Sequence, residues 1–435
     1  MTEKLNALVW SDAMLLLLLG SGLYFTLRIR GFQVRGWRTI LRRTVLSLRR
    51  TGNGDRHSLT QLQTLSTTLA ATMGTGNIVG VATALTLGGA GAVFWMWISA
   101  LLGMALVYAE NVLGMRYRYR NRDGSWCGGP IAYLERGLHC KPLALTFAGF
   151  CVLASFGMGN MAQVNSMAGA LQEAWRVPPW AVGLAATALC AGILWGGIRR
   201  IGRVAECLIP PLSLCYLLGC CILLALRYAE ILPAFRAIFT GAFGLSAVGG
   251  GVAGAAVRRC ANIGLRRGIF SNEAGLGSSS MLHAAAEQPD PSLQGMWGMF
   301  EVFADTIVCC TMTALVLLTA APSALDGAPL VMEAFAQGFG SAGTVFITAA
   351  VVLFAFATLI GWSCCGEAAV RYLSPHWGRP VYRLFFLAAC FVGATTELRT
   401  VWNLCDVCNG LMAIPNLIGM LALRRQITSP QTGAA

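Results

Sequence analysis

The sequence predicts an all-α membrane protein that crosses the bilayer about eleven times. Of its 435 residues, 56% are hydrophobic and only 12% are charged, whereas a soluble domain has roughly a quarter of its residues charged. Most of the molecular surface must therefore face something other than water. The chain also contains repeated apolar stretches of about 20 residues, the length that an α-helix needs to cross a bilayer core.

The predicted spans leave no room for a soluble domain. They lie near residues 7–27, 62–87, 92–115, 143–171, 179–197, 205–226, 246–265, 296–320, 342–366, 380–397 and 401–423. Segment 228–245 combines Pro233 with mixed polarity, so we expect an external amphipathic helix there. Since every remaining segment is only a loop, a membrane-anchored enzyme is disfavoured.

The residues that serve most enzymes and metal sites are few in this chain. The histidines fall in predicted loops and lack the spacing of paired metal ligands; they are His57, His139, His283 and His376. Cys405 and Cys408 have CxxC spacing, but they lie in an apolar span without a second pair. We therefore expect neither enzyme activity nor a resident cofactor.

The net charge of +13 comes from arginines that cluster between the spans, at 28–50, 116–122, 199–203, 258–267 and 424–425. Clusters on alternate loops follow the positive-inside rule, so they indicate topology rather than nucleic-acid binding. The N-terminus then lies outside a plasma or inner membrane, and the C-terminus is cytoplasmic. The basic residues that remain external are Lys4, Arg176, Arg227, Arg236 and Arg399.

Glycines interrupt the second span near its middle, at Gly74-Thr75-Gly76-Asn77. Unwound backbone at membrane depth is tolerated only where it lines a cavity or is covered by protein. Such a break offers carbonyl oxygens to Na⁺ and a half-helix N-terminus to a carboxylate. The alternative is close helix packing, because Gly76 and Gly80 also form a GxxxG pair.

A second glycine-rich stretch, at residues 246–254, favours the break over the packing interpretation. It includes Gly249, Gly250 and Gly251 and opens the seventh span, five spans after the second. By the arginine map these two spans run in opposite directions. Paired broken helices at corresponding positions are typical of inverted-repeat transporters.

Polar side chains within other spans are candidates to face these breaks. Gln163 is uncharged and offers donors and acceptors suited to a zwitterion. The Thr358 hydroxyl could complete an oxygen shell for Na⁺. Asp305 lies inside a span, where an isolated charge is costly, and either a gating or a structural role is open. We expect Glu110 and Glu367 to pair with loop arginines.

Longer motifs carry a resemblance to a known family. They include Gly74-Thr75-Gly76-Asn77-Ile78, Gly91-Ala92-Val93-Phe94-Trp95-Met96-Trp97, Gly159-Asn160-Met161, Gly268-Ile269-Phe270-Ser271-Asn272-Glu273-Ala274-Gly275-Leu276-Gly277-Ser278 and Asn409-Gly410-Leu411-Met412-Ala413-Ile414-Pro415-Asn416. In this order, from residue 60 to 420, they resemble the alanine or glycine:cation symporters, also called sodium:alanine symporters.

The resemblance implies a LeuT-like five-plus-five inverted repeat preceded by an extra N-terminal helix. Residues 1–57 would hold this helix and a basic cytoplasmic loop. The two five-helix repeats would span 58–227 and 228–425, and 426–435 would form a short cytoplasmic tail. The expected partners are alanine or glycine, Na⁺ as the coupling ion, and the lipid bilayer, with the protein as a monomer.

Together with the two predicted breaks, the resemblance also implies roles for individual residues. Candidate substrate-binding residues are Gly74, Thr75, Gly76, Asn77, Gln163, Gly249, Gly250, Gly251 and Trp362, where Trp362 would limit side-chain size. Candidate sodium ligands are Thr72, Gly76 and Thr358. Candidate gating residues are Asn272, Glu273 and Asp305, with the 271–277 motif at the cytoplasmic face.

The expected function is therefore sodium-coupled uptake of alanine or glycine by alternating access. Proton coupling is an open alternative. An ion channel is disfavoured, because neither pore repeats nor a filter loop is visible in the sequence.

Overall fold

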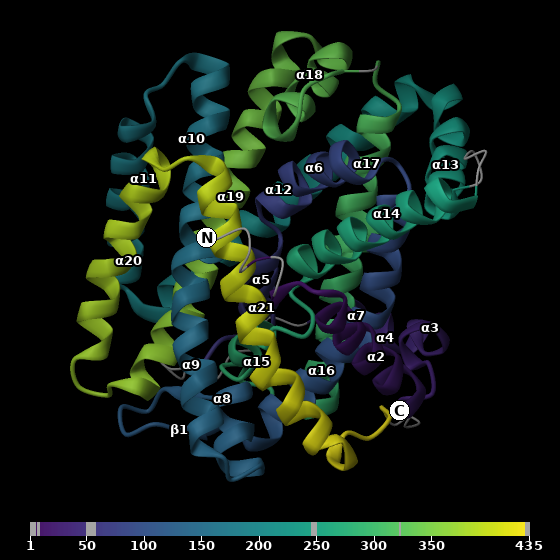
Figure 1. Ribbon diagram of the computed structural model, residues 1–435. Coiled ribbons are helices and arrows are strands. Elements are labelled where there is room, and N and C mark those ends of the chain that lie inside the picture. Colours follow the sequence, from purple (N-terminus) through teal and green to yellow (C-terminus); the bar gives the residue numbers. More distant parts are fainter. Residues whose placement is uncertain (1–5, 7–8, 49–57, 245–249, 322, 431–435) are drawn as a thin grey trace.

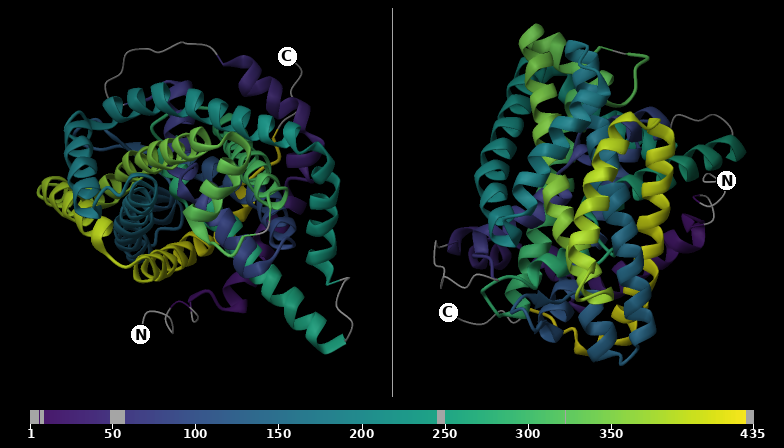
Figure 2. Two further views of the ribbon diagram at one scale, coloured as in Figure 1. Left: turned by 90° about the horizontal axis from the view of Figure 1, so that it is seen from above. Right: turned by 90° about the vertical axis from the view of Figure 1, so that its left-hand side faces the viewer.

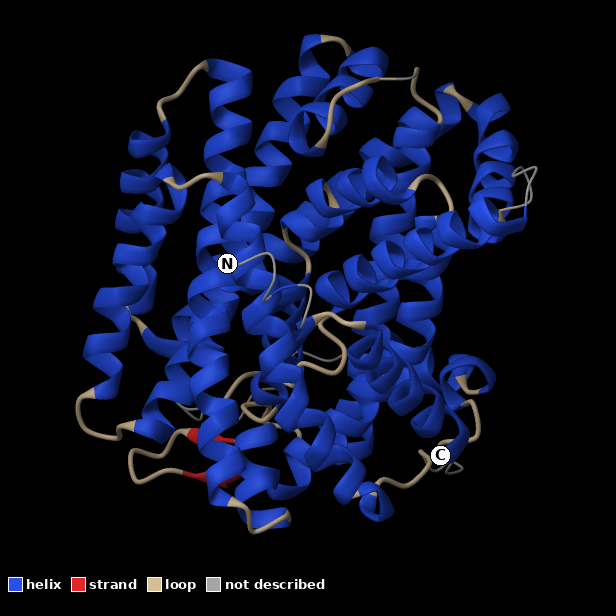
Figure 3. Ribbon diagram, in the orientation of Figure 1, coloured by secondary structure: helices blue, strands red, loops and turns tan. Residues whose placement is uncertain are grey.

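Figure 1 shows the computed structural model, which describes residues 6, 9–48, 58–244, 250–321 and 323–430. The described chain is almost entirely helical, as predicted (Figure 3). Its strands form one antiparallel hairpin, β1 (Tyr119–Arg120) with β2 (Trp126–Cys127). We call the end that carries this hairpin the lower end, and the opposite end, which carries α18 (Gly327–Phe339), the upper end.

Helices occupy the described part of every predicted span. In the first half they are α2 (Asp12–Arg28), α3 (Phe32–Arg35), α4 (Trp37–Arg43), α5 (Gln61–Thr72), η2 (Thr75–Asn77), α6 (Val79–Gly88), α7 (Ala92–Tyr117), α8 (Pro130–Ala132), η3 (Tyr133–Gly137), α9 (Lys141–Phe156), η4 (Gly157–Met161), α10 (Ala162–Trp175), α11 (Pro179–Leu194) and α12 (Gly197–Leu226). The predicted amphipathic segment forms α13 (Tyr228–Phe243).

The second half continues with α14 (Gly250–Asn272), α15 (Ser278–His283), α16 (Pro291–Val302), η5 (Phe303–Cys310), α17 (Thr311–Leu318), α18, α19 (Ser341–Leu373), α20 (Gly378–Thr395) and α21 (Leu398–Ala422). Short 3₁₀ turns lie at η1 (Val45–Ser47) and η6 (Arg424–Gln426). Seen from the side, the long helices run between the two ends of the molecule (Figure 2, right).

In the described part of the chain, six helical stretches are long and apolar enough to cross a membrane by length and composition alone. They are Ala92–Tyr117, Lys141–Trp175, Gly197–Leu226, Pro291–Leu318, Ser341–Leu373 and Cys405–Ala422. Some of the other predicted spans form shorter helices, since the second is divided into α5 and α6 and α11 has 16 residues. Helices α14 and α20, with 23 and 18 residues, are long enough but are not among the six. The total of about eleven crossings stays a prediction.

The second predicted span is interrupted at its glycines. Helix α5 begins with a capping box between Thr60 and Gln63 and ends at Thr72. Gly74 is extended, with φ −126° and ψ −149°, and the following three residues form the 3₁₀ turn η2 before α6 begins at Val79. The break therefore lies at the predicted residues 74–77.

The second interruption lies between α14 and α15, at residues 273–277. Gly275 and Gly277 have φ values of +89° and +86°, in the left-handed region that a right-handed helix cannot contain. Side chains cannot replace these hydrogens easily, because a Cβ on Gly277 would overlap Pro130 and one on Gly275 would lie 2.6 Å from Leu18 Cδ2. The motif predicted for the cytoplasmic face is thus a break in the interior.

The predicted break at 249–254 is wrong. Gly249 lies outside the described residues, but Gly250 and Gly251 are the first residues of α14, which runs without interruption to Asn272. A glycine costs a helix only about 1 kcal/mol, and tertiary packing can outweigh that penalty. A run of glycines is therefore weaker evidence of a break than residues with positive φ.

The arginine map also needs one correction. The sequence predicts that the 258–267 cluster shares a side with the other arginine clusters, but these residues belong to α14, which lies in the upper half of the molecule (Figure 1). Arg258 pairs with Asp12, and Arg266 lies 3.3 Å from Asp406 near the start of α21. They are arginines within a helix with acidic partners, and not a loop cluster of the kind the positive-inside rule counts.

Candidate functional site

Asn77 stabilises the unwound backbone of the first break. Asn77 Oδ1 accepts a hydrogen bond of 3.0 Å from the Gly74 amide, and its backbone oxygen accepts one of 2.8 Å from the Thr313 hydroxyl. The side chain thus replaces a helical carbonyl as acceptor. Asn77 is 2% exposed, so these polar groups are satisfied by protein rather than by water.

Gln163 and Thr358 both contact the first break, as the sequence predicts for a shared site. Gln163 Oε1 accepts hydrogen bonds from the Thr75 amide at 3.3 Å and from the Thr75 hydroxyl at 3.0 Å. A Cβ on Gly74 would overlap Thr358 Oγ1 and would lie 3.1 Å from Gln163 Oε1. Gly74 therefore lets helices α10 and α19 approach the unwound backbone closely.

A local distortion of the span that contains Gln163 orients this side chain. Residues Gly157–Met161 form the π-helical turn η4 between α9 and α10, and such turns in α-helices are frequent at functional sites. Gln163 Nε2 donates to the backbone oxygen of Met158 at 3.0 Å. The amide is therefore held with its oxygen towards Thr75.

Trp362 lies between η4 and the second break. Its indole Nε1 donates a 2.7 Å hydrogen bond to Glu273 Oε1, and the other carboxylate oxygen accepts from the Ser278 hydroxyl. Glu273 has a φ of +55°. A Cβ on Gly159 would overlap Trp362, so the fully buried indole is confined on both sides.

Asp305 links the first break to the last turn of α14, just before the second break. Oδ1 accepts a 2.6 Å hydrogen bond from Asn77 Nδ2, and Oδ2 accepts from the hydroxyls of Ser271 at 2.7 Å and Thr306 at 2.9 Å. The side chain is fully buried. Within the described residues no Lys, Arg or His pairs with it, so this carboxylate is surrounded by neutral oxygen- and nitrogen-bearing groups.

Other predicted site residues lie elsewhere or face away. The Thr72 hydroxyl bonds back to Thr68 O of its own helix at 3.2 Å. A Cβ on Gly76 would point at Phe270 of α14, 3.5 Å away, and not at Thr358. The roles of Thr72 and Gly76 as sodium ligands together with Thr358 therefore stay a prediction.

Sequence patterns missed several residues of this centre. Ser271 falls in the motif assigned to the cytoplasmic face, of which only Asn272 and Glu273 were named, as gating candidates. Thr306 adjoins Asp305 in a span without any break signal. Glu110 was expected to pair with loop arginines, but it is fully buried and accepts from Asn416 Nδ2 at 2.6 Å. Asn416 also donates to Gly275 O at 2.8 Å, so these two residues support the second break.

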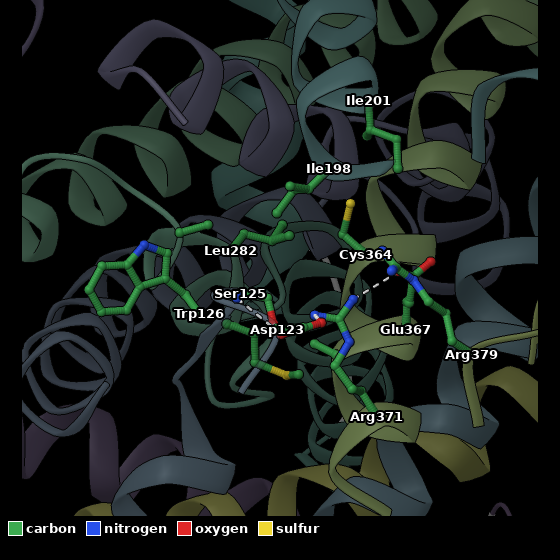
Figure 4. A pocket seen from close by; sticks show the side chains of 13 residues that line it. Asp123, Ser125, Trp126, Ile198, Ile201, Leu282, Cys364, Glu367, Arg371 and Arg379 are labelled. Carbon is green, nitrogen blue, oxygen red and sulfur yellow. Dashed lines mark hydrogen bonds and ion pairs between the residues drawn. The ribbon is translucent and has the colours of Figure 1, made fainter. Parts of the chain in front are cut away.

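A cavity of about 80 Å³ lies at the lower end. Its walls come from the β1–β2 turn, α12, α15 and α19, and include Asp123, Trp126, Leu282, Cys364, Glu367 and Arg371 (Figure 4). Arg371 bridges Asp123 at 3.3 Å and Glu367 at 3.1 Å. Glu367 also pairs with Arg379 and Arg383. Its partners are arginines, as predicted, but they lie in α19 and α20 and not in a loop.

Asp123 keeps its charge at this lower cavity. Partial burial alone would raise the pKa of its carboxyl group, but hydrogen bonds from Ser125 and the positive charge of Arg371 outweigh burial and leave the pKa below its ordinary value. The ion pair with Arg371 therefore persists near neutral pH.

A second cavity, of about 230 Å³, lies above the site. Its lining residues include Trp10, Leu87, Ile263, Arg266, Phe270 and Asp406. Phe270 adjoins Gly76, whereas Cys364 of the lower cavity is two residues from Trp362. The two breaks thus lie between the cavities, and Thr75, Asn77, Gln163, Glu273, Asp305, Thr358 and Trp362 are at most 2% exposed. The structure is closed towards both ends.

Solved structures of two other proteins resemble the chain in fold. The chain is similar in structure to MhsT in complex with L-phenylalanine, with a TM-score of 0.60 at 13% identity over 84% of this chain and 89% of that one. It is also similar to the Eremococcus coleocola manganese transporter, with a TM-score of 0.52 at 15% identity over 88% and 77% of the two chains. These similarities confirm the predicted LeuT-like fold.

Sequence relatives cover almost the whole chain. A sodium/alanine symporter AgcS of Methanococcus maripaludis is 41% identical over 99% of this chain and 95% of its own length. A probable sodium/glutamine symporter of Bacillus subtilis is 35% identical over 97% of this chain and 87% of its own length. A putative sodium/proton-dependent alanine carrier of the same organism is 32% identical over 97% of this chain and 89% of its own length.

The model of the sodium:alanine symporter family matches residues 1–431. The predicted family is therefore confirmed: the chain belongs to the sodium:alanine symporter family, and it is a multi-pass membrane transporter that carries an amino acid with a cation.

Proposed function

We propose that the protein couples the uptake of a small neutral amino acid, alanine or glycine, to Na⁺ by alternating access. The observation that carries this proposal is the position of Asp305, a buried carboxylate that joins the first break to Ser271 at the end of α14 and has no cationic partner among the described residues. A charge in such a place costs several kcal/mol unless it is compensated. A transported cation supplies that compensation during part of the cycle.

The oxygen atoms around Asp305 suit Na⁺. When the ion binds, the carboxylate and the hydroxyl oxygens of Ser271 and Thr306 become ligands, and carbonyl oxygens at the breaks can complete the shell. A second ion at Thr358 beside the Gly74 backbone remains part of the proposal. Each Na⁺ that crosses the membrane contributes about 2.3 kcal/mol per 100 mV to uptake.

The substrate would bind at the first break. Helix α6 begins at Val79, directly after η2, so the positive end of its dipole faces the break and favours a carboxylate there. Gln163 and Thr75 supply neutral polar contacts for the zwitterion. The confined indole of Trp362 leaves room for a small side chain only, which favours alanine or glycine over larger amino acids.

The arrangement in the membrane is also a proposal. The lower end carries most arginine clusters and would face the cytoplasm, while the upper end and the N-terminus would lie outside. The extra N-terminal helix would precede two five-helix repeats, 58–227 and 228–425, in a monomer of the cell membrane.

Proton coupling is the second candidate, because the buried Asp305 carboxylate could instead cross the membrane neutralised by a proton. One relative is named as a putative sodium/proton-dependent alanine carrier. Calorimetric titration of the purified protein with alanine distinguishes sodium coupling from proton coupling. The titration is done in NaCl and in choline chloride, each at two pH values. We expect binding in NaCl only, with competition by glycine but not by glutamine or leucine; equal binding in choline chloride would contradict sodium coupling.

Replacement of Gln163 by leucine tests the substrate contact. It leaves the Thr75 amide and hydroxyl without their acceptor, at a cost of about 1–3 kcal/mol. We expect the KM for alanine to rise roughly 10- to 100-fold in a proteoliposome uptake assay. Gln172→Leu, at an exposed position of the same helix, is the matched control and should leave the KM unchanged. An unchanged KM in Gln163→Leu would remove this residue from the site.

A further inference from the structure

A second buried cluster joins three helices at the lower end. His283 was predicted in a loop, but it ends α15 and is fully buried. Its Nε2 lies 3.1 Å from Glu301 Oε2 on α16. The other carboxylate oxygen, Glu301 Oε1, accepts a 2.6 Å hydrogen bond from the Thr68 hydroxyl on α5. The side chains of His283 and Glu301 are 0% and 4% exposed.

Hydrogen bonding fixes the proton on the other ring nitrogen. His283 Nδ1 lies 2.7 Å from Gln294 Oε1. The Gln294 NH₂ group faces the Gln288 backbone oxygen at 3.3 Å and Gln61 Oε1 at 2.8 Å. Because a backbone oxygen can only accept, Gln294 must present its own oxygen to the ring, and Nδ1 must donate.

The contact between Nε2 and Glu301 therefore holds a further proton. With Nδ1 protonated, an unprotonated Nε2 would place its lone pair against a carboxylate oxygen at 3.1 Å. The distance is that of a hydrogen bond, so one proton lies between these atoms. It belongs either to an imidazolium that faces a carboxylate or to a neutral ring that faces a carboxylic acid, and the pair is neutral overall in both cases.

Other ionisable groups near the pair have partners of their own. Glu206 of α12 accepts from Gln63, and Asp290 caps α16 and pairs with Arg43 of α4. The packed elements carry further ionisable groups, among them Tyr108 and Glu110 of α7, Arg118 after α7, Asp305 of η5 and Cys365 of α19, which are hydrogen-bonded elsewhere. Glu287, before α16, also has a partner.

The cluster links the lower parts of both broken helices. Thr68 lies on α5, and its backbone oxygen accepts from Thr72, one turn nearer the first break. His283 lies on α15, directly after the second break, and the preceding residues Met281 and Leu282 line the lower cavity. An opening towards this cavity that separates α5 from α15 strains the contact through Glu301.

We propose that His283 and Glu301 form a proton-binding site that closes the lower gate, with Thr68 as its attachment to α5. This inference rests on the proposed alternating-access cycle. In the closed state the pair binds one proton. When the gate opens and water enters, the hydrogen bond between the ring and the carboxylate breaks. Near pH 8 a solvated imidazole and a solvated carboxylate are both unprotonated, so the proton is lost.

The sign of the pH effect follows from this proton count. The closed state binds more protons than the open state above about pH 6.5, so lower pH favours closure and higher pH favours opening. With one proton released, the opening equilibrium changes by up to about tenfold per pH unit. The transporter would therefore release its substrate faster into an alkaline cytoplasm than into an acidic one.

Hydrogen–deuterium exchange of the substrate-free protein at pH 7 and pH 8 tests this site without reference to alanine or Na⁺. After correction for the intrinsic pH dependence of amide exchange, segments 61–72 and 278–286 of the wild type should exchange about tenfold faster at pH 8. Glu301→Gln carries a permanent N–H in place of the shared proton and should lose this dependence. Glu206→Gln, beside the same α5, is the matched control and should retain it.

A third variant distinguishes the effect of the shared proton from the effect of the hydrogen bond between Thr68 and Glu301. Thr68→Val removes only the hydroxyl that links Glu301 to α5, so segment 61–72 should lose protection while 278–286 keeps its pH dependence. Equal exchange of the wild type at both pH values, or an unchanged pH dependence in Glu301→Gln, would overturn the proton site. Failure of sodium-driven alanine uptake with the exchange pattern intact would overturn the proposed function alone.

Discussion

Asp305→Asn is expected to abolish sodium-driven uptake. The asparagine has nearly the same size, but it removes the negative charge that would face the ion. A unit charge about 4 Å from a cation contributes about 4 kcal/mol at the effective dielectric of a protein, which corresponds to a loss of roughly 10³ in Na⁺ affinity. The measurement is the dependence of alanine uptake on Na⁺ concentration in proteoliposomes.

Asp326→Asn provides the matched control for this change. Asp326 caps α18 by accepting from the Gly327 amide, and it is exposed, so its replacement should leave the Na⁺ dependence as in the wild type. If Asp305→Asn shows the same half-saturating Na⁺ concentration as the wild type, Asp305 does not bind the transported ion. If a pH gradient instead of a Na⁺ gradient drives alanine uptake by the wild type, proton coupling at Asp305 is indicated.

Gly74→Ala should reduce uptake by roughly 10- to 100-fold. The Gly74 backbone, with φ −126°, suits any residue, so the effect is steric alone. The new methyl group would overlap the Thr358 hydroxyl and press on Gln163 Oε1. Overpacking of this kind costs about 1–3 kcal/mol, and here the strain acts on the candidate substrate and ion contacts. Initial rates of labelled alanine uptake measure the effect.

Two other glycines of the same motif separate steric strain from general destabilisation. A Cβ on Gly80 meets nothing within 4 Å, and one on Gly76 makes an ordinary contact at 3.5 Å. Gly80→Ala and Gly76→Ala should therefore retain most of the uptake. Similar losses in all three variants would mean that the helix, and not the contact with Thr358, is sensitive.

The sequence predicted the spans and the first break well, since both depend on local composition. Apolar stretches located the helices, although α12 begins eight residues before its predicted span and α14 and α19 end seven residues after theirs. Gly74 to Asn77 marked the true interruption of the second span. The second break was misplaced because glycine content was taken as the signal. Its real marks are the positive φ values of Glu273, Gly275 and Gly277, which are set by tertiary contacts and are invisible in a residue count.

The sequence predicts which types of residue form the candidate site, but it does not predict the residues with which they form hydrogen bonds. Gln163, Thr358, Trp362 and Asp305 were chosen as polar or aromatic residues within spans, and the structure places the first two against Gly74 and Asp305 against Asn77. Their hydrogen bonds to the breaks join residues far apart in sequence. No local pattern could therefore show that Glu273 holds Trp362 or that Ser271 faces Asp305.

Uptake of labelled alanine into proteoliposomes, with and without an inward Na⁺ gradient and at equal pH on both sides, tests sodium coupling most directly. We expect accumulation above the external concentration only with the gradient, saturation with alanine, and inhibition by glycine. The same uptake without Na⁺, or flux that rises linearly with alanine concentration, would contradict a sodium-coupled symporter.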